Sequence, residues 1–182
     1  RYVLDPSVVD ALVFCTKNPQ PMLGRLEHLS AYDMFWFVTI TPYDREIEPF
    51  VPPKEDVIRS FIELSDMVGK ERMSWRYDPV FITEKYHIAC FAEMAEKLRG
   101  YTGQCVVSFL DLYEKTKRNF REAREVTKAE QERIIEAFAG IAGANGMQIN
   151  LCCENQALVR PNVDADGCLS QRVLEQAIGC GL

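Results

Sequence analysis

The sequence has no pair of cysteines at CxxC spacing and only two histidines, His28 and His87. Without such pairs, the chain by itself predicts neither a zinc ribbon nor the close cysteine group that holds an iron-sulfur cluster. The seven cysteines are an odd number and are scattered through apolar segments, unlike the dense, even set of a secreted disulfide-rich domain. We therefore expect a reducing, cytoplasmic location and no metal site formed by this chain alone.

Positive charge and long apolar runs are also scarce. The net charge of -6 and the pI of about 5.1 argue against general electrostatic binding of nucleic acid or of an anionic membrane. No apolar run approaches the roughly 20 residues that span a bilayer, and no basic start precedes an apolar leader. A soluble protein is predicted, and the first residue, Arg1, favours a fragment of a longer protein.

What the sequence does have is an alternation of strand-length apolar runs with helix-length amphipathic stretches. This order predicts βαβ units, a parallel sheet and one domain over residues 1–182. The predicted strands are Val8–Cys15, Met34–Ile40, Arg72–Tyr77, Cys105–Leu110 and Met147–Cys153. The predicted helices are Pro21–Ala31, Pro53–Val68, Thr83–Leu98, Leu112–Arg124, Lys128–Ala144 after a capping box at Thr127 and Glu130, and Val173–Ile178.

Several of these strands alternate polar with apolar residues. Ser74, Arg76 and Asp78 share one strand face, and Gln148, Asn150, Cys152 and Glu154 share another. In a doubly wound sheet both faces are covered, so its central strands are continuously apolar. A polar face is more natural in a complete or partial TIM-type (β/α) barrel, where it points into the lumen, and we expect that architecture over the flat sheet.

Every predicted strand ends in polar or ionisable residues, where (β/α) barrels place their chemistry. In the stretch "WRYDP", Pro79 favours an extended Asp78, which then projects to the same side as Arg76. Arg76 could clamp a carboxylate or phosphate while Asp78 orients the ligand or acts as a base. The alternative is a structural ion pair between strands.

Other strand ends supply weaker candidates. Lys17, before Asn18, is either an anion anchor or a solvated lysine at a turn. Cys152 is a candidate metal ligand or nucleophile, although a packing role is the simpler interpretation, and Glu154 is the better site candidate of the two. The long stretch "TPYDREIEPFVPP" is either a functional lid or a surface loop.

The stretches "VVDALVFCTKNPQPML", "TITPYDREIEPFVPPKE", "GKERMSWRYDPVFI", "VVSFLDLYEKTKRNF" and "LCCEN" resemble an uncharacterised bacterial and archaeal family catalogued as domain of unknown function 1848. The resemblance implies a radical S-adenosylmethionine-like barrel whose cysteine cluster lies beyond this chain, so that an iron-sulfur cluster and S-adenosylmethionine belong to the longer protein. At the position of Cys15 the family usually has a tryptophan, so this chain departs from the family there. The residues that would line the site are Lys17, Asn18, Thr41, Tyr43, Arg76, Asp78, Asp111, Tyr113, Lys117, Arg118, Asn119, Cys152 and Glu154.

Three hypotheses remain open from the sequence. The first is the barrel core of an iron-sulfur, radical-type enzyme that binds a small anionic or zwitterionic ligand, with Asp78, Asp111 and Lys17 as catalytic candidates. The second is a non-redox domain that binds a phosphate or carboxylate metabolite at the same place. The third is a structural module. A small-molecule ligand is expected in the first two, and the oligomeric state is not predicted.

Overall fold

The protein is a mixed α/β structure built on a six-stranded sheet, in a computed structural model that describes residues 4–81, 88–119, 124–179 and 181. Each strand pairs in parallel with the next one along the chain, in the order β1-β2-β3-β4-β5-β6. The strands are β1 (Leu12–Thr16), β2 (Met34–Thr39), β3 (Met73–Val80), β4 (Gln104–Phe109), β5 (Gln148–Leu151) and β6 (Val163–Asp164).

Helices connect most of the strands. They are α1 (Gln20–Leu23), α2 (Lys54–Val68), α3 (Ile88–Lys97), α4 (Glu114–Asn119), α5 (Lys128–Ala144) and α6 (Gln171–Ile178), with 3-10 turns at η1 (Leu26–Leu29), η2 (Lys70–Arg72) and η3 (Gln156–Leu158). The helix predicted over Lys128–Ala144 is confirmed, and both hydrogen bonds of its capping box are present. The predictions over residues 82–87 and 120–123 lie outside the described residues.

One prediction of local structure is wrong, and one short strand was missed. The helix expected over Pro21–Ala31 is instead the short α1 followed by η1, because Gly24 ends the first turn. The strand β6 was not predicted, since two residues carry no readable alternation. The remaining strands lie where they were expected, with ends that differ by up to four residues.

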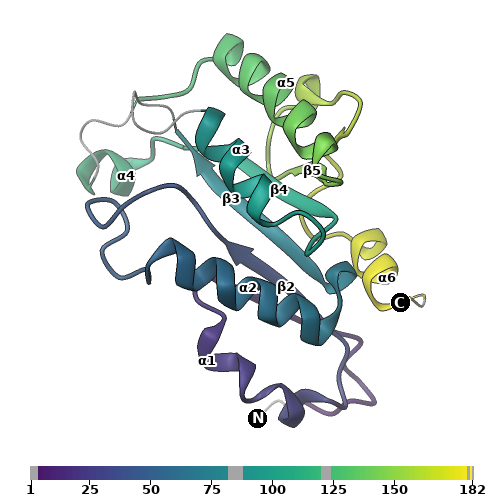
Figure 1. The fold of residues 1–182 in the computed structure, drawn as a ribbon. Helices are drawn as coiled ribbons and strands as arrows, with labels where there is room; N and C mark the ends of the chain where they lie inside the picture. Colours follow the sequence, from purple (N-terminus) through teal and green to yellow (C-terminus); the bar gives the residue numbers. More distant parts are fainter. Residues whose placement is uncertain (1–3, 82–87, 120–123, 180, 182) are drawn as a thin grey trace.

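The sequential strand order decides how the faces of the sheet are covered. Right-handed crossovers that always step in one direction place every connecting helix on the same face. Helices α2, α3 and α5 accordingly contribute to one core, together with the strand residues Trp36, Val38, Trp75, Tyr77, Cys105, Val107, Ile149 and Leu151. In Figure 1 these three helices lie on the same side of the strands.

The opposite face carries the alternate residues of the same strands. Its apolar part is a smaller cluster in which Phe35, Phe37 and Val106 meet Val173 and Ala177 of α6. Val13 and Cys152 pack against this cluster, and the polar members of the face include Ser74, Arg76, Asp78, Gln104, Ser108 and Asn150. The expectation of one polar sheet face is therefore confirmed.

The sheet is not closed. Among the strands of the described residues, β1 pairs only with β2 and β6 only with β5, so these two strands are the edges of the sheet. The expected complete or partial TIM-type barrel is therefore not confirmed, and the described residues form an open, six-stranded parallel sheet. A closed barrel would require the first and last strands to pair.

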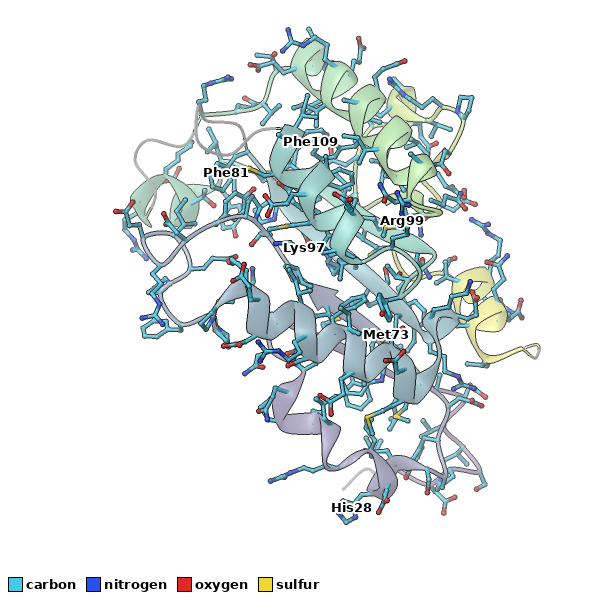
Figure 2. All side chains as sticks on the ribbon, in the orientation of Figure 1. His28, Met73, Phe81, Lys97, Arg99 and Phe109 are labelled. Carbon is cyan, nitrogen blue, oxygen red and sulfur yellow. The ribbon has the colours of Figure 1, made fainter. Side chains whose placement is uncertain are left out.

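The two ends of the strands have different surroundings. In Figure 1, α4 lies near the end where β3 finishes, whereas α6 lies near the end where β3 begins. Figure 2 places Phe81 and Phe109 near the first end and Met73 near the second, with His28 far from both. No helix within the described part of the chain is long and apolar enough to cross a membrane.

The aromatic residues at the centre of the main core should contribute strongly to the free energy of unfolding. Phe91 is fully buried, stacks on Phe138 at 3.8 Å between ring centroids and also stacks on Trp75 at 4.9 Å. Phe91→Ala should lower the free energy of unfolding by about 3–5 kcal/mol, because it leaves a cavity between helices and sheet. Phe50 is 97% exposed, and Phe50→Ala should change the same quantity by less than about 0.5 kcal/mol. Urea unfolding followed by circular dichroism measures both; equal effects would contradict the packing described.

Candidate functional site

The C-terminal ends of β3 and β4 bring three polar side chains into direct contact. Arg76 donates through Nη2 to Oδ2 of Asp78, and Ser108 donates through Oγ to Oδ1 of the same carboxylate. The Arg76 and Asp78 side chains are 19% and 23% exposed, so the pair is only partly open to solvent. The prediction that Arg76 and Asp78 project from one face is confirmed by this contact. Ser108 was not predicted, because its partner lies 30 residues away in sequence.

The guanidinium of Arg76 remains charged in this setting. Burial opposes its charge, but the hydrogen bond and attraction to Asp78 outweigh burial and raise the pKa of Arg76 above its usual value. The guanidinium carbon also lies 5.6 Å from the centre of the Phe37 ring. Since a guanidinium has five N–H donors and Asp78 occupies Nη2, the remaining donors give it capacity for a second acceptor.

Glu154 lies at the same end of the sheet, directly after a residue with a left-handed backbone conformation. β5 ends at Leu151, and Cys153 adopts a left-handed conformation with φ of 59°. The Glu154 carboxylate then accepts a hydrogen bond of 2.7 Å from the backbone N–H of Phe109, on the neighbouring strand. The preference for Glu154 as a site residue thus has a structural basis, although no sequence signal indicated its partner.

The environment of Glu154 favours its protonated form. Burial raises the pKa of Glu154 most, and the nearby carboxylates of Asp111 and Asp78 raise it further, against the opposing effect of the Phe109 hydrogen bond. Glu154 is therefore influenced by two further carboxyl groups, and one of these, Asp78, is the ion-pair partner of Arg76. The local charge is acidic rather than basic.

Cys152 contacts a second cysteine that sequence reasoning missed. Its Sγ lies 3.1 Å from Sγ of Cys168, in the segment between β6 and α6. Burial and the hydrogen bond to Cys168 raise the pKa of Cys152 to about 12, so this thiol is not an activated nucleophile. The separation of 16 residues gave no sign of the contact.

Lys17 lies in a different group, centred on Glu48. The Glu48 carboxylate forms ion pairs of 2.5 Å with Lys17 and with Lys54, and accepts a 2.8 Å hydrogen bond from Thr41. Burial acts against the charge, but the two lysines hold the pKa of Glu48 below its usual value. Glu48 was missed because it lies inside the long loop after β2. The group ties this loop to the ends of β1 and β2 and to the start of α2.

The other predicted site residues have varied surroundings. Tyr43 is buried, stacks on Phe81 at 4.1 Å and donates a 2.5 Å hydrogen bond to the carbonyl of Pro79. Asn18 accepts from the backbone N–H of Gln20 at 3.3 Å, which is a turn contact. Asp111 and Tyr113 are exposed, as are Lys117 and Arg118 on α4, and nothing is described for the Asn119 side chain.

No three histidine, cysteine or carboxylate side chains in the described part of the chain lie together as a metal site. Those residues therefore do not fit the three-cysteine binding of an iron-sulfur cluster.

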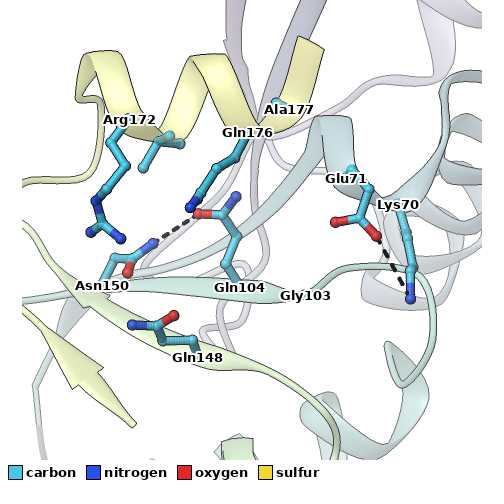
Figure 3. A pocket seen from close by; sticks show the side chains of 10 residues that line it. Lys70, Glu71, Gly103, Gln104, Gln148, Asn150, Arg172, Gln176 and Ala177 are labelled. Carbon is cyan, nitrogen blue, oxygen red and sulfur yellow. Dashed lines mark hydrogen bonds and ion pairs between the residues drawn. The ribbon is translucent and has the colours of Figure 1, made fainter. Parts of the chain in front are cut away.

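A cavity of about 130 Å³ lies at the opposite end of the strands, between the sheet and α6 (Figure 3). Its lining includes Gln104 and Asn150, joined by a 2.8 Å hydrogen bond, and Lys70 with Glu71, which form an ion pair of 3.7 Å. These amides and paired charges satisfy one another. The cavity does not contain the ionisable strand ends, which we regard as the candidate site on chemical grounds.

Fold and site together define a mixed α/β protein whose parallel sheet carries ionisable groups at the C-terminal ends of its middle strands. The chain belongs to the family described as Domain of unknown function (DUF1848), whose model matches residues 1–181. Neither the curated proteins nor the solved structures contain a match. The family resemblance read from the sequence is therefore confirmed.

The coupling among the carboxylates can be measured on Glu154. Because the negative charge of Asp111 raises the pKa of Glu154, Asp111→Asn should lower that pKa. Asp56→Asn, in the first turn of α2 on the other side of the sheet, should leave it unchanged. Carbon-13 NMR titration of the glutamate side chains measures the shift; an unchanged pKa in Asp111→Asn would contradict the arrangement.

The raised pKa of Glu154 also makes the stability of the protein depend on pH. A folded-state pKa above the ordinary 4.5 means that the folded protein binds the Glu154 proton more tightly than the unfolded chain. The stability contributed by this proton is fully present below pH 4.5 and is lost as the pH rises through the folded-state pKa. Glu154→Gln should therefore become more stable relative to the native protein as the pH rises through this window, measured by urea unfolding.

Proposed function

We propose that the group formed by Arg76, Asp78, Asp111 and Glu154 binds a small zwitterionic ligand, one that carries a carboxylate and an amine. The observation that supports this is a partly buried guanidinium paired with Asp78, together with the electrostatic effect of Asp78 and Asp111 on Glu154. The unoccupied donors of Arg76 suit the ligand carboxylate, and the excess of acidic groups suits its ammonium group. Phosphate or another simple anion fits less well, because Asp78 and Glu48 already neutralise Arg76 and Lys17.

The sheet is interpreted in this proposal as part of a (β/α) barrel with the ligand on its inner face. Sequential parallel strands, helices α2, α3 and α5 on one face and polar residues on the other support that interpretation. Doubly wound sheets instead reverse their strand order and cover both faces with helices.

The family resemblance makes S-adenosylmethionine the first zwitterion to test. Its amino acid end carries the carboxylate and the ammonium group that Arg76 and the acidic residues would hold. The wider proposal is a radical S-adenosylmethionine-like enzyme that acts at the C-terminal ends of these strands. The alternative is a non-redox domain that binds an amino acid or similar metabolite with the same residues, and the identity of the zwitterion that binds separates the two.

The experiment is isothermal titration calorimetry with S-adenosylmethionine, with free amino acids, and with analogues that lack either the amine or the carboxylate. Arg76→Met should weaken binding of the cognate zwitterion by about 2–5 kcal/mol, because a charged partner of the ligand is removed. Arg160→Met is a matched control: the Arg160 side chain is 20% exposed and pairs with Glu136, yet it lies outside the group. It should bind as the native protein does.

A second variant separates binding from structure. Arg76→Met leaves Asp78 without its ion pair, whereas the double variant Arg76→Met/Asp78→Asn removes both charges together. The proposal expects the double variant to fold and to lose binding. If it binds each zwitterion as the native protein does, or if only analogues lacking an amine bind, the proposal is wrong and the ion pair is structural.

A further inference from the structure

Cys152 and Cys168 are held together by the backbone on both sides of their contact. The N–H of Cys152 donates to the Val107 carbonyl at 3.0 Å, which keeps this residue in register with β4. On the other side, Arg172 of α6 binds Asp164 and Asp166 at 2.5 and 3.1 Å, and Gly167 turns the chain with φ of 96°. Cys168 is thus fixed between two anchored points.

The sulfur atoms are close to bonding distance. They lie 3.1 Å apart, so a disulfide bond of about 2.05 Å requires them to approach by about 1 Å. Both residues are partly exposed, which admits a small reagent, whereas Cys105 is fully buried. The sulfur atoms also interact electrostatically with Arg76, whose positive charge favours a thiolate beside it.

We propose that Cys152 and Cys168 form a reversible disulfide by exchange with a low-molecular-weight disulfide such as oxidised glutathione. One thiolate attacks a sulfur of the small disulfide, and the first small thiolate leaves. The other cysteine loses its proton and attacks the protein sulfur of the mixed disulfide, and the second small thiolate leaves. The two cysteines give up two electrons and two protons, and the small disulfide becomes two thiols.

Cys168 is the better candidate for the first attack. The high pKa of Cys152 keeps its proton in place, so the S–H of Cys152 can donate to a thiolate at Cys168. Cys152 then acts as the resolving thiol, at the distance of the observed contact. The reaction needs no bound ligand and is independent of the function proposed for the Arg76 group.

The bond would connect the end of β5 to the segment that leads into α6. It would close a loop between residues 152 and 168, on the polar face of the sheet beside Arg76. Because the cross-link restricts the unfolded chain, the oxidised protein should melt about 5–10 °C above the reduced one.

The test incubates the protein with glutathione mixtures from fully reduced to fully oxidised, alkylates the free thiols and digests the chain after glutamate. Glu154 lies between the two cysteines, so digestion separates them into peptides 137–154 and 155–175. The expected result is a linked pair of these peptides whose mass is two hydrogens less than their sum. Reduced glutathione should reverse the link.

Two variants assign the bond to its cysteines, and a third tests the effect of Arg76 on the rate at which it forms. The link should persist in Cys153→Ser, where the neighbouring exposed thiol is removed, and should be lost in Cys168→Ser, whose fold is checked by circular dichroism. Arg76→Met should form the link more slowly at the same pH. Loss of the link in Cys153→Ser would show that Cys153, and not Cys152, forms the bond, and would overturn the proposal. Full alkylation of Cys152 and Cys168 at every glutathione ratio would also overturn it.

Discussion

The structure depends on one constraint, the alternation of side chains in parallel strands that follow one another in chain order. Because each crossover steps in the same direction, helices α2, α3 and α5 share one face with Trp75 and Tyr77. The alternate residues Arg76 and Asp78 must then lie on the other face. The polar group at the strand ends is a consequence of how the apolar core is built.

Charge is balanced locally at these ends rather than by the protein as a whole. Asp78 neutralises Arg76 and accepts from Ser108, while Glu48 joins Lys17 and Lys54. Two separate groups result, one with an excess of carboxylates at β3 to β5 and one that anchors the loop after β2. In the proposed function the ligand binds at the first group, whereas the charge of Lys17 in the second group is already paired with Glu48.

The polar face also brings together residues that respond to different conditions. Glu154 has a raised pKa beside Asp111, and the thiols of Cys152 and Cys168 touch within reach of the Arg76 charge. Protonation of Glu154 and the proposed oxidation of Cys152 and Cys168 would therefore take place at neighbouring groups on one face of the sheet. Such proximity is common where burial and like charges shift the properties of functional groups.

Much of the fold was determined by the sequence itself, since helix caps, apolar periodicity and strand alternation are local signals. They located α5 to the residue, identified five of the six strands in the described part of the chain and placed Arg76 beside Asp78. Contacts such as Ser108 with Asp78, Glu48 with its two lysines, and Cys168 with Cys152 were decided by tertiary structure alone. The same holds for the open edges of the sheet, because strand pairing and side-chain contacts between distant segments depend on how the layers pack, which no local pattern records.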